Sequence, residues 1–264
     1  MSLLSEQYFD SKKFMARIEL NRRFRTNPYP WTLWIFDQIK FPENAKVLEL
    51  GCGNAILWKS NLERIPDDAQ ILLTDFSKGM MEDARKVLGN ASDRFEYEIM
   101  DAQQISYPDD SFDIIIANLM LYHIPDRKKA ISEISRVLKA DGALYATTYS
   151  RDNMKELTDL LKNYDDTLSN SIEPFARAFG LENGKEQLHE SFEEIEMINY
   201  IDSLEVTEAE PLINYILSFG RIKENINDEN LREFKNYIND ILDKDGKIKI
   251  SKDTGIFIAK KPNK

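Results

Sequence analysis

The order of apolar and polar residues changes character at about residue 41 and again at about residue 150. Between these points, short apolar runs that end in acidic or turn-forming residues predict β-strands. The predicted strands are AKVLEL (45–50), AQILLTD (69–75), RFEYEIMD (94–101), FDIIIANLML (112–121) and ALYATTYS (143–150). The segments between the runs carry apolar residues at helical spacing, which predicts helices at 54–65, 77–89 and 126–142. Strands that alternate with helices favour parallel βαβ units, so we expect an α/β fold with a doubly wound, mostly parallel sheet.

Helical patterns dominate on either side of this predicted core, which spans residues 41–150. We expect helices at 5–26 and 31–40, separated by the prolines of NPYPW, because a proline disfavours helix at the residue before it. After the core we expect helices at 152–165, 173–180, 208–219 and 228–243, and strands at 192–202 and within 246–261. The strands of this last region are expected to close the sheet of the core, and its helices are expected to be accessory.

The acidic composition narrows the classes of partner. Lys and Arg total 35 against 46 Asp and Glu, a net charge of -11, so nucleic acid is a disfavoured partner. The single cysteine, Cys52, excludes an intrachain disulfide and a cysteine-based zinc cluster, and no motif indicates another metal site. The N-terminus has no secretory signal pattern, and the run IIIANLMLY is about half of what a membrane span needs. We therefore expect a cytoplasmic protein with no membrane span, either a monomer or a homodimer.

The turn after the first predicted strand, in VLELGCGNA (47–55), has two glycines one residue apart. In a βαβ unit such a turn binds a nucleotide-like ligand at the carboxyl ends of the strands. A dinucleotide site needs a third glycine where this chain has Ile56, and the Lys-Ser/Thr pair of a phosphate-binding loop is absent. The carboxylate of Glu49 repels a pyrophosphate but suits a cation. These features together indicate S-adenosylmethionine, a nucleoside that carries a sulfonium and an ammonium instead of phosphates.

The ends of the next three predicted strands supply what such a ligand requires. Asp75 can accept hydrogen bonds from the ribose hydroxyls, and the apolar Phe76 and Met80 can flank the adenine. Asp101 can accept from the adenine amino group. The end of the fourth strand, ANLML, offers a backbone site for the methionyl part of the ligand.

Four segments in this order carry a resemblance to a known family: VLELGCGNA, LLTDFSKGMME, MDAQQISYPDDSFDIIIANLMLYHI and EISRVLKADGALYATTY. Together they resemble class I S-adenosylmethionine-dependent methyltransferases, most of all the methyltransferase type 11 group that contains ubiquinone and menaquinone biosynthesis enzymes. The resemblance covers about residues 45–150. It implies a Rossmann-like sheet of seven strands, S-adenosylmethionine as cofactor and S-adenosylhomocysteine as product. Ala55 takes the third small position of the family's glycine motif, which is a mild departure.

The resemblance also implies roles for single residues. The residues assigned to the cofactor are Glu49, Gly51, Cys52, Gly53, Asp75, Phe76, Met80, Asp101, Ala102, Asn118 and Leu119. Asn118 is expected to contact the ammonium or the carboxylate of the methionyl part. Residues 1–40 are expected to form a helical lid over the cofactor, and residues 151–264 a cap on the acceptor side. Candidate contacts from the lid are Arg17, Arg25 and Tyr29.

The acceptor of the methyl group is less well defined by the sequence. Transfer from a sulfonium releases a neutral thioether, so alignment and exclusion of water matter more than acid catalysis. A base is needed only where the acceptor must lose a proton, and His123 is the candidate that can act as a base or orient the substrate. Tyr29 and Tyr122 are further candidate catalytic residues. The fourth strand is followed by NLML instead of the proline-containing loop of DNA amino-methyltransferases, and Cys52 lies in the glycine turn instead of a nucleophile loop. With a net charge of -11, a small-molecule acceptor is favoured.

Two other functions stay open at the level of the sequence. One is a non-catalytic sensor or partner protein that binds S-adenosylmethionine without transferring the methyl group. The other is an RNA or protein methyltransferase that uses the basic segment 12–25 as its docking face. Single residues also have purely structural interpretations: Asp75 can cap a helix, His123 can be structural, and Cys52 is expected to be a small turn residue instead of a nucleophile.

Overall fold

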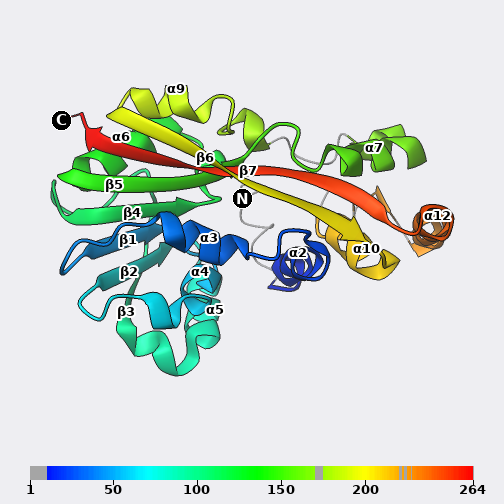
Figure 1. Ribbon diagram of the computed structural model, residues 1–264, viewed down its shortest axis with the longest axis horizontal. Coiled ribbons are helices and arrows are strands. Elements are labelled where there is room, and N and C mark those ends of the chain that lie inside the picture. Colours follow the sequence, from blue (N-terminus) through cyan, green and yellow to red (C-terminus); the bar gives the residue numbers. More distant parts are fainter. Residues whose placement is uncertain (1–10, 170–174, 220–221, 223–224, 227, 264) are drawn as a thin grey trace. The chain divides into compact units, whose positions relative to one another are not determined.

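The computed structural model describes residues 11–169, 175–219, 222, 225–226 and 228–263 (Figure 1). Contacts between Cα atoms divide the chain into two compact units, and each is described by itself. The first, called the sheet unit, comprises the described residues of Tyr29–Arg151, Phe175–Tyr200 and Thr254–Lys264. The second, called the helical unit, comprises those of Met1–Pro28, Asp152–Pro174 and Ile201–Asp253.

Seven strands form one sheet in the order β3-β2-β1-β4-β5-β7-β6. Their bounds are β1 Lys46–Leu50, β2 Gln70–Asp75, β3 Phe95–Ile99, β4 Phe112–Asn118, β5 Leu138–Tyr149, β6 Phe192–Val206 and β7 Ile248–Pro262. The first five strands pair in parallel, whereas β7 runs antiparallel to β5. The expected α/β fold with a doubly wound, mostly parallel sheet of seven strands is therefore confirmed.

Helices cover both faces of this sheet in the sheet unit. Successive residues of a strand point to opposite faces, so an apolar strand needs a covering on each side. Val47 and Ile114 face one apolar core, whereas their neighbours Leu48 and Ile115 face another. The first core includes side chains of α3 (Trp31–Gln38), α4 (Ile56–Lys59) and α5 (Lys78–Leu88). The second includes side chains of α6 (Arg127–Val137) and α9 (Gly184–His189). Burial on both faces explains why β4 is almost continuously apolar.

The helix predicted at 54–65 is much shorter in the structure. α4 ends at Lys59, and only a 3₁₀ turn, η1 at Leu62–Arg64, follows it. Asn61 lies between them, and its buried amide donates to the carbonyls of Leu57 and Thr32 at 2.8 and 3.0 Å. An asparagine side chain that bonds to the backbone in this way competes with continued helix.

The boundary between α6 and β5 also differs from the prediction of a helix over 126–142. α6 ends at Val137, and β5 begins at Leu138, which is fully buried. Gly142 lies within the strand, where a Cβ atom would approach the Asp113 carbonyl oxygen to 2.9 Å. The Ala-Asp-Gly sequence therefore serves a close backbone approach at a shift of strand register, and not the end of a helix.

Other predicted elements differ mainly in length. A second 3₁₀ turn, η2 at Gly89–Arg94, joins α5 to β3. The prediction of a helix at 173–180 was wrong for its described part, which contains only the 3₁₀ turn η4 at Phe175–Arg177, and α9 was not predicted. Residues 5–10 and 173–174 of the predicted helices lie outside the described residues.

The helical unit has its own apolar core. Its helices are α2 Ser11–Phe24, α7 Lys155–Tyr164, α8 Asp166–Ser169, α10 Ala209–Leu217 and α12 Asp228–Asp245. They pack with the parts of β6 and β7 that belong to this unit, and the fully buried residues include Leu20, Leu161, Leu204, Ile216 and Phe234. Each of these five residues comes from a different element, so the core assembles from segments far apart in the sequence. None of the helices in the described part of the chain is long and apolar enough to cross a membrane.

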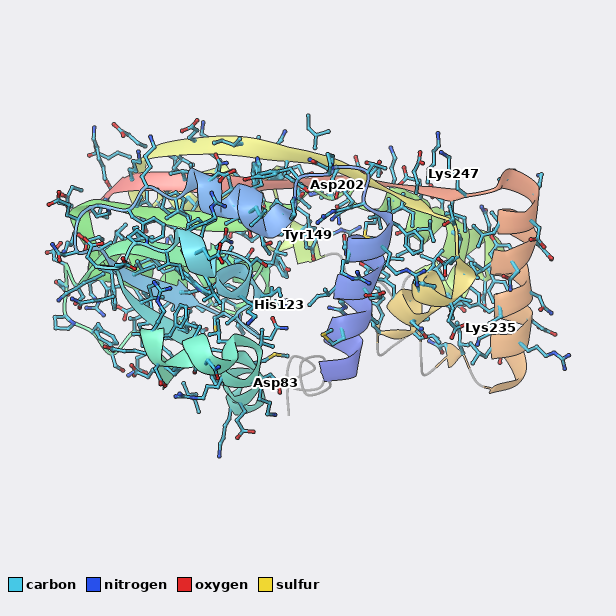
Figure 2. All side chains as sticks on the ribbon, turned by 60° about the horizontal axis from the view of Figure 1, so that its bottom comes forward. Asp83, His123, Tyr149, Asp202, Lys235 and Lys247 are labelled. Atoms are coloured by element: carbon cyan, nitrogen blue, oxygen red, sulfur yellow. The ribbon has the colours of Figure 1, made fainter. Side chains whose placement is uncertain are left out.

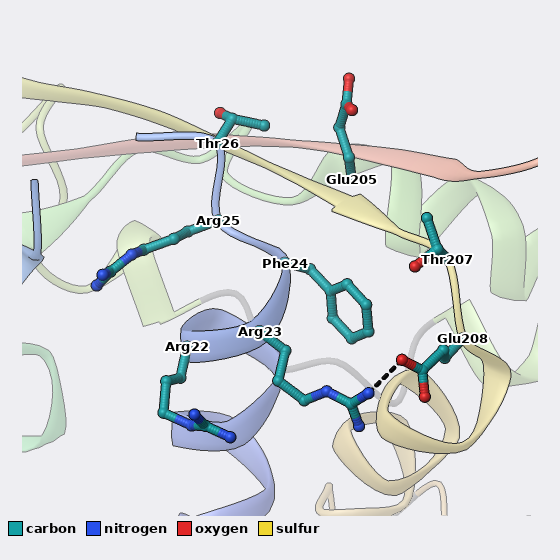
Figure 3. A pocket seen from close by; sticks show the side chains of 8 residues that line it. All are labelled: Arg22, Arg23, Phe24, Arg25, Thr26, Glu205, Thr207 and Glu208. Carbon is teal, nitrogen blue, oxygen red and sulfur yellow. Dashed lines mark hydrogen bonds and ion pairs between the residues drawn. The ribbon is translucent and has the colours of Figure 1, made fainter. Parts of the chain in front are cut away.

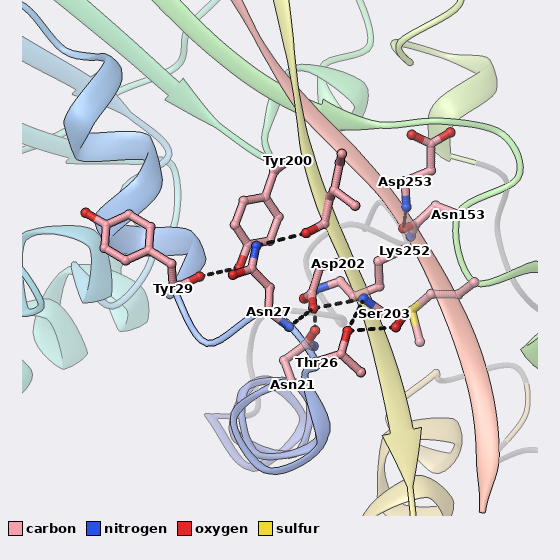
Figure 4. Close-up of polar contacts among 12 residues, drawn as sticks. Asn21, Thr26, Asn27, Tyr29, Asn153, Tyr200, Asp202, Ser203, Lys252 and Asp253 are labelled. Atoms are coloured by element: carbon pink, nitrogen blue, oxygen red, sulfur yellow. Dashed lines mark hydrogen bonds and ion pairs between the residues drawn. The ribbon is translucent and has the colours of Figure 1, made fainter.

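A buried ion pair ties strands β6 and β7 together inside the helical unit (Figure 4). The Lys252 ammonium lies 3.4 Å from the Asp202 carboxylate and donates to the side-chain oxygen of Asn21 at 2.6 Å. The backbone N–H groups of Asn27 and Ser203 donate to the other carboxylate oxygen at 3.0 and 2.8 Å. Burial lowers the pKa of Lys252, while Asp202 opposes this change. The pair therefore fastens the N-terminal segment to both strands.

The arginine-rich end of α2 borders a hollow of about 830 Å³ in the helical unit (Figure 3). The lining residues are Arg22, Arg23, Phe24, Arg25, Thr26, Glu205, Thr207 and Glu208. Most of the charges are paired with acids: Arg23 with Glu208, and Arg22 with Glu19 at 2.9 Å. This pairing explains how a basic helix is accommodated in an acidic protein.

Candidate active site

The glycine turn after β1 connects the strand to α4 through three residues with positive φ. These are Gly51 at 66°, Gly53 at 56° and Ala55 at 58°. The Cys52 N–H donates to the Thr74 carbonyl at 2.8 Å, which joins the turn to β2. The thiol of Cys52 is buried, and this burial raises its pKa well above the usual value. The structure therefore agrees with Cys52 as a small turn residue.

The two glycines of the turn have different surroundings. A Cβ atom on Gly51 would lie 2.9 Å from the Cβ of Met120, in the segment that follows β4. Apart from its two neighbours in the chain, a Cβ atom on Gly53 would meet no atom of the described residues within 4 Å. Gly51 is thus required by the packing of the protein itself, whereas Gly53 leaves open space in which a ligand can approach the backbone.

The carboxylate of Asp75, at the end of β2, organises this turn. One oxygen accepts from the Gly53 N–H at 3.0 Å, and the other accepts from the Ser77 N–H at 2.8 Å. The N-cap of α5 is Ser77, whose hydroxyl accepts from the Met80 N–H, so Asp75 is not the cap. Burial raises the pKa of Asp75, and these backbone donors oppose the rise. Each oxygen keeps a second lone pair, so the carboxylate can still accept from a ligand hydroxyl.

Glu49 is buried beneath the turn, with 1% of its surface exposed. Its carboxyl accepts from the indole N–H of Trp58, on α4, at 2.5 Å. Burial raises its pKa to about 8, with a further rise from the charge of Asp75 and a fall from the Trp58 hydrogen bond. Glu49 is therefore mostly protonated at neutral pH until a cation comes close. The partner Trp58 was not foreseen, because the sequence does not show which face of α4 meets β1.

Two apolar side chains stand exposed at neighbouring strand ends, where the adenine is expected. Phe76, directly after β2, is 76% exposed, and Ile99, the last residue of β3, is 55% exposed. Ile99 is paired with Asp75 in the strand register, and sequence reasoning missed it because nothing separates it from a core isoleucine. Met80 is only 3% exposed and belongs largely to the interior.

Asp101, after β3, is held by the side chain of Gln103. Its carboxylate accepts from the Gln103 backbone N–H at 2.9 Å and from the Gln103 amide at 3.0 and 3.1 Å. The oxygen of the same amide accepts from the N–H of Asp126, which caps α6. Ala102, which lies between Asp101 and Gln103 in the sequence, is buried. Gln103 is thus a further residue of this edge that was not predicted.

The end of β4 turns sharply at Leu119, whose φ is 53°. The Leu119 N–H donates to the hydroxyl of Thr147, on β5, at 2.9 Å, and this hydroxyl donates to the Asn118 side-chain oxygen at 2.7 Å. Asn118 and Thr147 are partners in the register of the two strands. Thr147 is fully buried, and its role was not apparent from the sequence because it depends on this pairing.

Three aromatic rings lie close together near the ends of β4 and β5. Two of them, His123 and Tyr149, are labelled in Figure 2. The ring of Tyr122 lies 4.4 Å from that of His123 and 5.0 Å from that of Tyr149, between ring centroids. Tyr122 and His123 belong to the 3₁₀ turn η3 at Leu121–His123, and Tyr149 ends β5. All three are partly exposed. Two of the three candidate catalytic residues, Tyr122 and His123, are therefore neighbours, next to the segment that carries Leu119.

The other lid candidates belong to different surroundings. Tyr29 donates its hydroxyl to Asp37, on α3, at 2.5 Å, and this hydrogen bond is the main reason why its pKa is raised. Arg25 belongs to the helical unit and forms a β-bridge with Leu204. Arg17, in the same unit, donates to the Ser218 hydroxyl and lies over the ring of Phe219. Their predicted contacts with the cofactor stay predictions.

Comparison with known proteins agrees with this geometry. Residues 48–146 match the family model described as a methyltransferase domain. These residues therefore form a methyltransferase domain. The chain is 28% identical over 123 residues to the ubiquinone/menaquinone biosynthesis C-methyltransferase of Pectobacterium atrosepticum, a match that covers 46% of this chain and 49% of that protein. The chain thus spans about half the length of the curated relatives it matches.

Solved structures share the fold of this methyltransferase domain and its surroundings. A methyltransferase candidate from Bacillus halodurans superposes with a TM-score of 0.60 at 18% identity, over 88% of this chain and 99% of that one. Phosphoethanolamine N-methyltransferase 2 of Haemonchus contortus, solved with S-adenosyl-L-methionine, gives 0.58 at 21% identity, over 97% of this chain and 58% of that one. At these identities the likeness concerns the fold alone.

Proposed function

We propose that this protein transfers the methyl group of S-adenosylmethionine to a small-molecule acceptor. The proposal is supported most directly by Asp75, which joins the glycine turn to the end of β2 through Gly53 and still has lone pairs for a ribose. The matched family model supports the same cofactor. Among the relatives, the Pectobacterium enzyme is a C-methyltransferase of quinone biosynthesis, which is in line with a small acceptor.

The residues of this edge fit the chemistry of the cofactor. Open space beside Gly53 allows the backbone to be approached, and Phe76 and Ile99 offer apolar surfaces for the adenine. Asp75 and Asp101 supply acceptors for hydroxyl and amino groups, and Glu49 supplies a buried acid for a cationic group. No phosphate-binding pattern competes with this assignment in the glycine turn.

The cofactor supplies an electrophilic methyl group on a sulfonium, and the protein has to align the acceptor with it and exclude water. The turn at Leu119 and the rings of Tyr122, His123 and Tyr149 lie at neighbouring strand ends, where they can form one wall for an acceptor. His123 can receive a proton if the acceptor must lose one. The predicted lid 1–40 and cap 151–264 are proposed to complete the enclosure.

A calorimetric titration with S-adenosylhomocysteine tests the cofactor, and transfer of labelled methyl groups to fractions of a metabolite extract tests the acceptor. We expect saturable binding and label in a low-molecular-weight fraction. Saturable binding without transfer to any fraction would favour the non-catalytic binder, and label in RNA or protein would overturn the small-molecule acceptor. Absence of saturable binding of S-adenosylhomocysteine would contradict the proposed function as a whole.

A further inference from the structure

The hydrogen bonds around Thr147 fix the direction in which the Asn118 amide faces. A backbone N–H can only donate, so the Thr147 hydroxyl oxygen accepts from Leu119 at 2.9 Å. The hydroxyl proton then needs an acceptor, and the Asn118 side-chain oxygen lies 2.7 Å away. Because Thr147 is fully buried, water is no alternative partner for that proton.

The opposite orientation of the amide leaves a buried proton unpaired. If the NH₂ group of Asn118 faced Thr147, the hydroxyl would meet two donors, and no other described residue accepts its proton. A buried donor without a partner is penalised by the loss of its hydration. The network therefore assigns the oxygen of Asn118 to Thr147 and its NH₂ group to the other side, independently of how similar the two amide atoms look.

The outward NH₂ group is available to a ligand. It makes no hydrogen bond to the part of the chain that the structure describes, and it is not a buried atom, so solvent reaches it. Asn118 ends β4, whose register places its neighbour Ala117 beside Leu50, the residue before the glycine turn. The NH₂ group can therefore only donate, at the strand end next to the turn.

We propose that Asn118 binds the carboxylate, and not the ammonium, of the amino-acid part of the cofactor, and that Thr147 is a positioning residue that selects this orientation. The inference rests on the proposed function and adds to it which charged group the end of β4 recognises. An amide NH₂ group matches a carboxylate, which accepts, whereas an ammonium needs an acceptor. The Asn118 oxygen is the only acceptor of this side chain, and it is turned towards the fully buried Thr147 hydroxyl. The same hydroxyl also holds Leu119 in a left-handed conformation that a leucine seldom adopts.

The test compares two ligands, S-adenosylhomocysteine and its decarboxylated analogue, which keeps the amine and lacks the carboxylate. For the unaltered protein we expect the first to bind about tenfold to hundredfold more tightly, the range of a charge-assisted hydrogen bond. Thr147→Val keeps the shape but removes the hydroxyl, so this ratio should fall towards one. Thr147→Ser restores the hydroxyl and should restore the ratio.

Thr148→Val is the matched control. Thr148 is equally buried on the next position of β5, and its hydroxyl donates to the Phe179 carbonyl at 2.7 Å. This variant should lose thermal stability as Thr147→Val does, yet keep the ligand ratio. Asn118→Asp, at the partly exposed end of β4, should favour the decarboxylated ligand because its carboxylate repels that of the other ligand.

The outcomes separate the two proposals. If the unaltered protein binds S-adenosylhomocysteine but does not discriminate between the ligands, the carboxylate assignment is wrong and the proposed function stands. A ratio that survives both Thr147→Val and Asn118→Ala also contradicts the carboxylate assignment, and the second variant decides the matter if the first does not fold. If the unaltered protein binds neither ligand, both proposals fail.

Discussion

The sheet unit and the helical unit are stabilised in different ways. In the sheet unit, polar groups at the strand ends bind backbone N–H groups of neighbouring turns, as Asp75 does with Gly53 and Ser77. In the helical unit, the prominent polar contact is an ion pair inside the molecule, between Asp202 and Lys252. The strand ends of the sheet unit keep free lone pairs on Asp75 and open space beside Gly53. The charged groups of the ion pair in the helical unit are bonded largely to other groups of the protein. The comparison supports the proposal that the cofactor binds at the strand ends of the sheet unit.

The first and largest expected effect tests whether the helical unit depends on its buried pair. Asp202→Ala leaves the Lys252 ammonium buried without its carboxylate, which should lower the free energy of unfolding by about 3–5 kcal/mol. Circular dichroism follows the helices of both units, while tryptophan fluorescence follows the sheet unit alone, because Trp31, Trp34 and Trp58 all belong to it. The loss should appear in the helical signal, and affinity for S-adenosylhomocysteine should stay unchanged.

Glu205→Gln is the matched control: Glu205 lies on β6, and its partner Lys247 directly precedes β7. Glu205 pairs with Lys247 at 2.6 Å, but both side chains are about two-fifths exposed, at 41% and 39%. Exposed ion pairs contribute little, so this variant should unfold like the unaltered protein. Figure 2 labels Asp202 and Lys247, one member of each pair. If both variants are equally stable, the buried pair is not what holds the helical unit together.

The second effect concerns binding at the sheet unit. Asp75→Ala removes an acceptor for the ribose and frees the Gly53 N–H, which should weaken binding of S-adenosylhomocysteine by about 1.5–3 kcal/mol in a calorimetric titration. Asp113→Ala is the control, because Asp113 accepts from Lys46 at the opposite end of β1. Equal affinities for the two variants would remove Asp75 from the binding site.

The third effect is a dependence of stability on pH. Glu49 has a pKa of about 8 in the folded protein, above its usual value of 4.5. The folded state therefore holds the proton more tightly, and the free energy of unfolding should fall as pH rises from about 4.5 to about 8. The slope is at most about 1.4 kcal/mol per pH unit for this group. Glu49→Gln should reduce the slope in urea denaturation followed by tryptophan fluorescence, although Asp75 shifts in the same direction and keeps part of it.

The smallest expected effect tests how Trp58 contributes to the pH dependence of stability. Trp58→Phe keeps an aromatic ring in the core but removes the N–H that bonds to Glu49, a hydrogen bond that lowers the pKa of this carboxyl. The lower edge of the pH range is set by the unfolded chain and should not move. The upper edge should rise by up to about one pH unit, since a hydrogen bond contributes about 0.5–1.5 kcal/mol. An unchanged upper edge would mean that Trp58 does not stabilise the ionised form.

The strands of the core could be predicted because each is a local pattern. An apolar run that ends in a turn residue predicts both the strand and where it ends. The candidate site residues were chosen because they lie at those predicted ends. The helices were less accurate where one side chain or one contact decides the boundary. Asn61 ends α4 through bonds to two carbonyls, and Gly142 fits β5 against Asp113, and neither contact is visible in a local pattern.

The candidate site divides in the same way. The positions of Asp75 at the end of its strand and of Asp101 near the end of the next were foreseen, but the groups that hold them were not. Gln103 over Asp101 depends on the conformation of one short loop, and Trp58 against Glu49 depends on which face of α4 meets β1. Thr147 beside Asn118 depends on the register of two strands that are distant in the sequence. The core of the helical unit could not be predicted from the sequence for the same reason. Its residues come from three segments that are separated in the sequence by residues of the sheet unit.

Substitutions at the two glycines of the turn after β1 measure two different properties of the protein. A methyl group added at position 51 strikes Met120, so substitutions there report on how the segment after β4 closes over the turn. A methyl group added at position 53 enters empty space, so its steric effect is felt only by whatever occupies that space. Both residues have positive φ, so the backbone strain is common to both changes and cancels in the comparison. Two glycines of one motif can therefore separate the demands of folding from those of the ligand.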